Sequence, residues 1–189
     1  MKILTTPMCD DVLKIAGIRD YRVVLPSEIN DADGDVIITL SETEVNIDKI
    51  PIKLNSYKQL LDSIMMLCER FNTNFDCEKI EYIKNLINQN NEKKDKRKDI
   101  KVKVYANFLK DTLVDMGFNV VDEDYDYIVV ADYMDVEIED DMIVVSSHKN
   151  VSRNIIDRLN ERYELLENKL CMQQWLIQAE FINIMKWKS

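Results

Sequence analysis

Short apolar runs in the first half of the chain predict three strands, with one helix between the first two. The strands are expected at 3–5, 21–25 and 35–40, and the helix at about 8–17. The run at 35–40 is nearly all apolar, which is typical of a strand in a parallel sheet that is covered on both faces. The first half therefore predicts a β-α-β-β unit.

The same order of elements recurs 100 residues later along the chain. Apolar runs predict strands at 101–105, 119–121 and 126–130, and the pattern between the first two predicts a helix at 107–117. Three residues of the first helix, Asp11, Leu13 and Gly17, recur as Asp111, Leu113 and Gly117. The chain has three glycines, and two of them stand at these matching helix ends, where a left-handed conformation favours glycine. We therefore expect two lobes of the same design.

The segment between the two halves predicts two helices. The first has Ser56 as N-cap and an apolar stripe at helical spacing: Tyr57, Leu60, Leu61, Ile64, Cys68 and Phe71. The second carries a narrower stripe at Cys77, Ile80, Ile83 and Ile87, which predicts a continuous helix over roughly 76–91 that links the lobes. The run at 88–99 has no apolar residue and is either a flexible linker or the solvated end of this helix. The absence of Gly, Pro and Ser favours the helix.

The end of the chain predicts one more strand and two helices. The strand is expected at 142–145, and an amphipathic helix follows at 151–170. The segment 171–187 is a second, more apolar helix, but its glutamines and its Glu180, Asn183 and Lys186 argue against a membrane span. It would dock on its own lobe, or expose a face that forms a homodimer or binds a protein partner.

Together these patterns predict an α/β fold with two similar β-α-β-β lobes, mostly parallel sheets, a long connecting helix and an extra C-terminal helix. The domains are expected at 1–75 for the N-terminal lobe, 76–99 for the linking helix, 100–170 for the C-terminal lobe and 171–189 for the C-terminal helix.

Four stretches of the sequence carry family-like motifs: residues 6–17, 35–41, 50–64 and 142–159. Together they resemble the class III periplasmic binding proteins with the helical-backbone metal-receptor fold. Residues 6–17, TPMCDDVLKIAG, are similar to the family's opening S-P-S-x-T-E-I-L-x-x-L-G, and residues 35–41 are similar to its P-D-L-V-I strand. Residues 50–64 are similar to its strand and S-x-x-x-I-x-x-S-I run, and residues 142–159 to its closing strand and helix. The resemblance implies a two-lobed receptor for a siderophore, haem or corrinoid, bound between the lobes.

Composition and charge narrow the function classes. The net charge of −10 and the sequence pI near 4.7 argue against nucleic acid and anionic membranes as partners. The N-terminus has no apolar stretch of the kind found in a signal peptide, so we expect a cytoplasmic protein. Cys9, Cys68, Cys77 and Cys171 form no CxxC pair, and Cys68 and Cys171 are expected to be buried thiols.

Loops at the carboxyl ends of parallel strands are where ligands bind in sheets of this kind. The candidate residues of an inter-lobe cleft are therefore those that follow the predicted strands: Thr5, Thr6, Pro7, Met8, Cys9, Ser41, Glu42, Tyr105, Asn107, Asp132, Tyr133, Ser147 and His148. Ser and Thr in such loops also act as helix caps, which is the alternative interpretation for each of them.

The chemistry of these residues favours binding over catalysis. Cys9 and His148 would supply axial ligands to a chelated metal, because thiolate and imidazole are both good ligands for transition metals. A single histidine excludes a three-His site, and three isolated glycines supply no phosphate loop. A Cys9–His148 nucleophile pair has no local signature in its favour. The ten acids between Asp122 and Asp141 lack a calcium-loop pattern and are expected to form a solvated or partner-facing rim.

We therefore expect a cytoplasmic binding protein, and not an enzyme, for a small metal chelate of the haem, corrinoid or siderophore type. The alternative is an interaction or regulatory module that binds protein through its acidic lobe and C-terminal helix.

Overall fold

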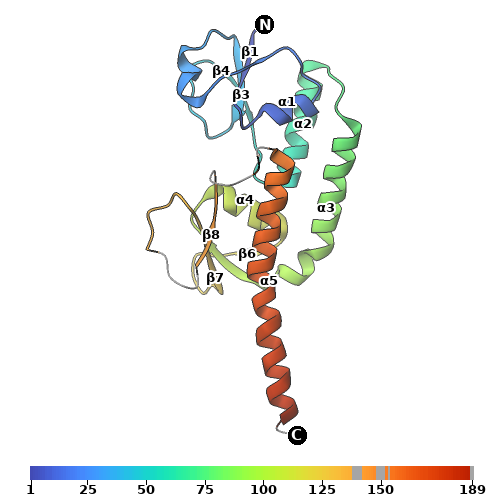
Figure 1. The fold of residues 1–189 in the computed structure, drawn as a ribbon, viewed down its shortest axis with the longest axis vertical. Helices are drawn as coiled ribbons and strands as arrows, with labels where there is room; N and C mark the ends of the chain where they lie inside the picture. The colour runs from blue at the N-terminus through green and yellow to red at the C-terminus, as the bar shows by residue number, and fades with distance from the viewer. Residues whose placement is uncertain (138–141, 148–151, 153, 188–189) are drawn as a thin grey trace. The chain divides into compact units, whose positions relative to one another are not determined.

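The computed structural model describes residues 1–137, 142–147, 152 and 154–187, and for 172–187 it describes the backbone only (Figure 1). The chain forms two compact units. Unit 1 contains Met1–Gln89 and Ser152–Arg158, and unit 2 contains Asn90–Val151 and Leu159–Ser189. The chain therefore crosses from one unit to the other within the helix that begins at Cys77, and again near the start of the last helix.

Unit 1 is built on a four-stranded parallel sheet with the order β2-β1-β3-β4. In chain order its elements are β1 (Ile3–Thr5), α1 (Asp10–Ile15), β2 (Arg22–Val23), the 3-10 helix η1 (Pro26–Asp31), β3 (Val36–Leu40), β4 (Asp48–Ile52), α2 (Tyr57–Phe71) and the first part of α3 (Cys77–Arg97). The predicted strands at 21–25 and 35–40 are present but shorter. Ser56 caps α2 as expected, and its side chain accepts a hydrogen bond from the Gln59 N–H.

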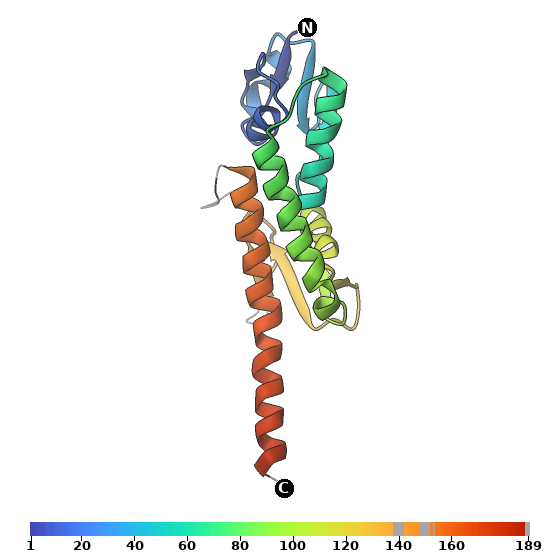
Figure 2. The same cartoon turned by 90° about the vertical axis from the view of Figure 1, so that its right-hand side faces the viewer.

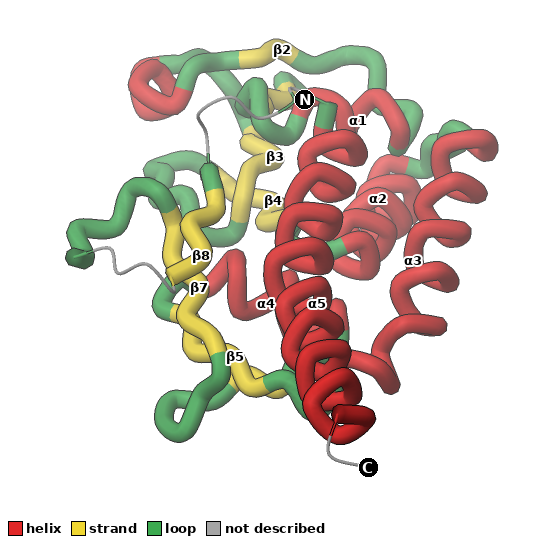
Figure 3. Tube along the Cα trace, turned by 60° about the horizontal axis from the view of Figure 1, so that its bottom comes forward, coloured by secondary structure: helices red, strands yellow, loops and turns green. Residues whose placement is uncertain are grey.

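Unit 2 repeats this architecture, with the strand order β6-β5-β7-β8 and every pair of neighbouring strands parallel. Its elements are β5 (Lys101–Val104), α4 (Asn107–Met116), β6 (Asn119–Val120), β7 (Tyr127–Ala131), β8 (Met142–Val145) and α5 (Ile155–Trp187), whose first residues belong to unit 1. Figure 3 shows the strands of each sheet side by side. The identical strand order confirms the repeat that the 100-residue offset predicted.

The two faces of the unit 1 sheet are covered by different kinds of structure. The side chains of Leu4 and Ile37 form a small core with Val24 and with Ile29 of η1. Ala32, Val45 and Ile47 close this core from the loops. The α-helices of the unit lie on the other side of the strands in Figure 3. This explains why β3 is buried along Val36–Thr39 although α-helices cover only one face.

Two of the observed helices differ from the predicted ones. The helix predicted over 76–91 is confirmed, and α3 continues to Arg97, so most of the run at 88–99 is helical. The two helices expected at 151–170 and 171–187 form one continuous helix, α5. No Gly or Pro occurs after Gly117, so nothing in the sequence interrupts the helical backbone near Cys171.

Candidate functional site

The carboxyl end of the unit 1 sheet is closed by buried hydroxyl and thiol groups. Thr5, Thr6 and Cys9 are all buried. The Thr5 hydroxyl donates to the Ile38 carbonyl of β3 at 2.9 Å, and the Thr6 hydroxyl donates to the Cys9 sulfur at 3.5 Å. These groups satisfy one another inside the unit, as buried polar groups do.

Cys9 is fully buried at the start of α1. Burial raises the pKa of its thiol to about 11, and hydrogen bonding with Thr6, the Leu40 backbone and Thr39 offsets only part of this effect. At neutral pH the group is therefore a thiol, whereas a metal ligand must be a thiolate. Axial ligation by Cys9 stays a prediction, and the metal would have to displace this proton.

The other residues of this first loop lie nearer the surface. Pro7 is exposed, and the sulfur of half-buried Met8 is contacted by the Arg158 guanidinium at the start of α5. In the same unit the Asp11 carboxylate accepts a hydrogen bond from the Ile155 N–H at 3.1 Å. A carboxylate at a helix N-terminus is favoured by the unpaired N–H groups and the helix dipole. Asp11 therefore fixes the start of α5.

Ser41 and Glu42 follow β3 in a loop that is held by a lysine. The Ser41 N–H donates to the Ile52 carbonyl at 2.9 Å. The Lys49 ammonium donates to the carbonyl oxygens of Ser41 and Thr43 at 3.0 and 2.9 Å. Glu42 is exposed. Lys49 thus fixes the backbone of this loop and leaves the Glu42 side chain in solvent.

In unit 2, Asp132 organises the carboxyl ends of β7 and β8. Its carboxylate accepts hydrogen bonds from the Ser146 hydroxyl at 2.9 Å, the Ser147 hydroxyl at 2.8 Å and the Ser147 N–H at 3.0 Å. The structure therefore brings together the predicted site residues Asp132 and Ser147. His148, the other predicted metal ligand, lies outside the described residues.

Aromatic side chains gather at the same edge of unit 2. Tyr105 follows β5 and is 49% exposed, and Tyr133 follows β7 and is 62% exposed. The Tyr133 ring lies 6.4 Å from the ring of Phe108, which is covered in turn by the Arg162 guanidinium at 4.8 Å. Asn107, at the start of α4, is also exposed. This edge therefore offers flat aromatic surfaces next to a cation.

Part of the acidic segment is tied to the protein instead of being only a solvated rim. The Lys101 N–H donates to the Asp126 carboxylate at 2.7 Å, and the Lys101 ammonium is paired with Asp124. Asp122, Glu123, Asp135 and Glu137 are exposed, as expected. Residues 138–141 of this segment lie outside the described residues.

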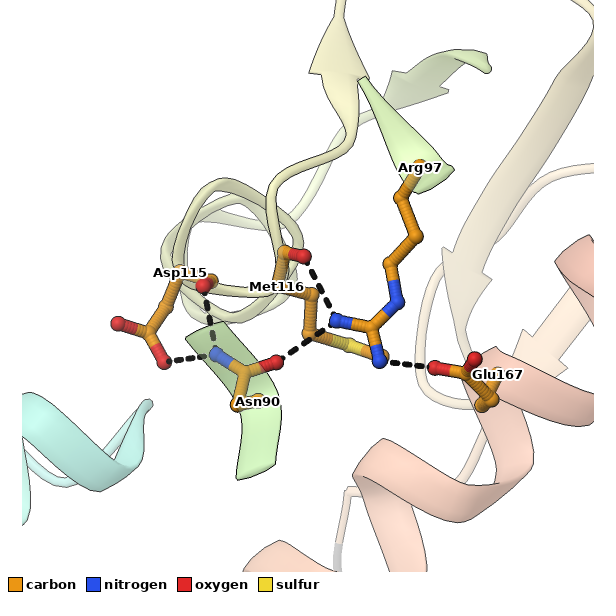
Figure 4. Close-up of polar contacts among 5 residues, drawn as sticks. All are labelled: Asn90, Arg97, Asp115, Met116 and Glu167. Carbon is orange, nitrogen blue, oxygen red and sulfur yellow. Dashed lines mark hydrogen bonds and ion pairs between the residues drawn. The ribbon is translucent and has the colours of Figure 1, made fainter. Parts of the chain in front are cut away.

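A buried cation in unit 2 was missed by the sequence analysis. Arg97, at the end of α3, is 2% exposed and lies in a polar cluster with Asn90, Asp115, Met116 and Glu167 (Figure 4). Its guanidinium donates to the Asn90 amide oxygen and to the Met116 carbonyl at 2.7 Å each, and it is paired with Glu167. Asn90 in turn donates to the Asp115 carbonyl at 2.8 Å. The cluster joins α3, α4 and α5 within unit 2.

The sequence spacing of the residues in this cluster indicates a buried helix face, although their polar and charged side chains suggest an exposed one. Ile83, Asn90 and Arg97 follow one another at intervals of seven residues, which is about two helical turns. They therefore continue the face of the buried Ile83. The charge of the run at 88–99 suggested a solvated surface, but two of its residues are buried because they have partners on α4 and α5.

All four cysteines are free, with Cys9 and Cys68 buried, Cys171 half-buried and Cys77 exposed. Within the described residues, no three His, Cys, Asp or Glu side chains come together in a group that would hold a bare metal ion. Over the same part of the chain, no helix combines the length and the apolarity needed to cross a bilayer.

Known structures share the fold of this chain but have little sequence identity with it. No family profile matches the sequence, and no curated protein matches it. A mutant structure of the laminin-binding adhesin Lmb from Streptococcus agalactiae is similar with a TM-score of 0.59 and 9% identity, over 89% of this chain and 98% of that one. A Zn(II)-bound variant of AdcAII from Streptococcus pneumoniae is similar with a TM-score of 0.54 and 14% identity, over 90% of this chain and 98% of that one.

At these identities the likeness is one of fold. It agrees with the two parallel four-stranded sheets described above, and with the two-lobed α/β architecture that the resemblance to class III periplasmic binding proteins implied.

Proposed function

We propose that this protein binds a small metal chelate or tetrapyrrole-like ligand at the carboxyl ends of its parallel strands. The observation that carries the proposal is the exposed aromatic edge of unit 2, where the Tyr133 ring lies next to Phe108, which the Arg162 guanidinium covers, and where Tyr105 is exposed at the end of the neighbouring strand. Aromatic rings stack on flat conjugated ligands, and an arginine pairs with carboxylate groups on such ligands. The Zn(II) ion in the structurally similar AdcAII variant supports a metal-containing ligand.

We propose that the carboxyl edge of the unit 1 sheet, taken by itself, would bind a ligand through its shape more than through charge. Thr5, Thr6 and Cys9 are buried and hydrogen-bonded, so the groups nearest to solvent on the first loop are Pro7 and Met8. Cys9 and His148 each stay proposed as an axial ligand of a chelate that contains iron or cobalt.

The test is a titration with hemin, cobinamide, a ferric hydroxamate siderophore and Zn(II), each followed by visible absorption where the probe absorbs and by thermal melting. Binding to the folded state alone stabilises by about 2.7 kcal/mol at a hundredfold excess over Kd. We expect one of the three chelates to give both signals. Tyr133→Ala should weaken its binding about tenfold, whereas the matched control Tyr82→Ala, at an exposed tyrosine of α3, should not change it.

The exposed acids of unit 2 favour a second candidate function, in which this lobe binds a basic protein partner. If no probe binds, this interaction module becomes the better interpretation. A ligand that binds without any effect of Tyr133→Ala would instead place the site away from the aromatic edge.

A further inference from the structure

The helix α5 continues well beyond the part that packs on unit 2. Its buried stripe consists of Leu159, Tyr163, Leu166 and Leu170, and the helical backbone then runs on to Trp187. Among the described elements of unit 2, Figures 1 and 2 show none beside this C-terminal part of the helix. A helix of this length without tertiary contacts is only marginally stable in water.

Apolar residues lie on two faces of this part of the helix: Ile177, Phe181 and Ile184 continue the stripe that packs on unit 2, and a broader set lies on the opposite face. At 100° per residue, the following residues fall within a single arc: Met172, Trp175, Leu176, Ala179, Ile182 and Trp187. The spacing of Met172, Trp175, Ala179 and Ile182 is three, four and three, which is the pattern of helices that pair in coiled coils. The arc is centred about 150° around the helix from the stripe that packs on unit 2. The same continuous helix therefore cannot use both faces against its own unit.

The charge of this part is also unusual for the chain. Between 171 and 187 the charged residues are Glu180 and Lys186, whereas the whole chain is 32% charged with a net charge of −10. Repulsion between two copies of such an acidic protein is therefore smallest here.

We propose that residues 172–187 of α5 pair with the same residues of a second copy of this chain. A second copy carries the same face at the same concentration, and two-fold dimers are the commonest soluble oligomers. Trp175 and Trp187 alone supply about 300–500 Å² per copy. Met172, Leu176 and Ile182 bring the face close to the roughly 800 Å² per partner that a stable interface buries. The proposal is independent of the ligand proposed above.

The test is the mass of the full chain in solution, measured by light scattering after size exclusion. At about 50 µM, where an interface with micromolar Kd is saturated, the expected mass is twice the chain mass of 22.3 kDa. The double variant Trp175→Glu/Ile182→Glu should be monomeric, with Kd raised at least about a hundredfold, because it places charges in the paired face. The control Gln174→Glu/Gln178→Glu adds the same charge outside that face and should stay dimeric.

Circular dichroism and thermal melting of both variants check that the units remain folded. If Trp175→Glu/Ile182→Glu unfolds at a lower temperature than the unaltered chain, the mass of the unaltered chain on dilution becomes the test. A reversible dimer must dissociate toward 22.3 kDa. A monomeric unaltered chain at the higher concentration overturns the proposal. So does equal dimerisation of both variants. A monomer that floats with vesicles of phosphatidylcholine and phosphatidylglycerol would assign the face to a membrane surface instead.

Discussion

At the scale of single residues, the most informative groups are buried ones whose partners come from distant parts of the sequence. Cys9 and Arg97 are both almost completely buried, yet one is a neutral thiol among hydroxyls and the other a cation with a carboxylate partner. Their environments differ, and each leads to a measurable expectation.

The buried thiol of Cys9 should make stability depend on pH in the alkaline range. Its pKa rises from 9.0 to about 11 on folding, so the unfolded chain loses this proton first and stability falls as pH rises from 9 to 11. The loss from this group is at most about 2.7 kcal/mol. Denaturant unfolding of Cys9→Ala should show a shallower alkaline decline than the unaltered chain.

Cys77→Ala is the matched control, because Cys77 is exposed. Equal alkaline slopes for Cys9→Ala and the unaltered chain would contradict the assignment. Below pH 9 both should be independent of pH as far as this group is concerned.

The pair of Arg97 and Glu167 should be worth more than an exposed ion pair. Glu167→Gln leaves a buried guanidinium without its anionic partner, which should lower the free energy of unfolding by about 2–3 kcal/mol. Glu164→Gln, on an exposed position of the same helix, should change it by less than about 0.5 kcal/mol. A combined Arg97→Met/Glu167→Gln variant should lose less than the sum of the single variants, which a double-mutant cycle measures.

The sequence could not predict these environments, because they depend on partners far along the chain. Thr6 and Cys9 are three residues apart and were predicted to lie in one loop that lines a ligand cleft, but the burial of that loop depends on β3. Arg97 has a partner 70 residues away on α5. A charged run in a sequence most often lies on a solvated surface. For the run at 88–99 this expectation was wrong at Asn90 and Arg97.

At the scale of elements, sequence patterns predicted most of the fold. Strands such as 35–40 are short and nearly all apolar, and the glycines at positions 17 and 117 mark where α1 and α4 end. Prediction failed where two elements merged. The pattern changes near Cys171, but a change of pattern does not break a helix without a residue that opposes the helical backbone.

The two matching glycines should respond differently to alanine. Both have positive φ, 75° at Gly17 and 90° at Gly117, which costs alanine about 1 kcal/mol. At Gly17 an added Cβ would lie 2.1 Å from the Asn74 backbone oxygen, whereas at Gly117 it would meet the Lys94 side chain at 2.8 Å. We expect Gly17→Ala to cost about 1–3 kcal/mol more than Gly117→Ala, since the backbone cannot move away as easily.

Thermal or denaturant unfolding of the two variants compares these costs directly. A replacement of Val114, an exposed residue of α4, by Ala serves as the reference. An equal loss at both glycines would show that the conformational cost dominates and that the contact at Asn74 relaxes.

At the scale of the whole molecule, two units with separate sheets and cores should melt separately. Ile37 and Leu109 are fully buried, one in each unit, and replacing either by Ala should cost about 2–5 kcal/mol. We expect calorimetry to resolve two transitions, with Ile37→Ala shifting one and Leu109→Ala shifting the other. One transition that both variants shift equally would show that the units unfold as one.

The use of α5 by both units has a consequence for how the chain is made. The strands of each sheet are contiguous in sequence, so both sheets can form while the ribosome is still adding residues. Ser152–Arg158 nevertheless belongs to unit 1, and the Ile155 N–H meets Asp11 there. Neither unit is therefore complete until the last part of the chain has left the exit tunnel. A nascent chain stalled before residue 152 would hold two sheets without the contacts that α5 makes in both units.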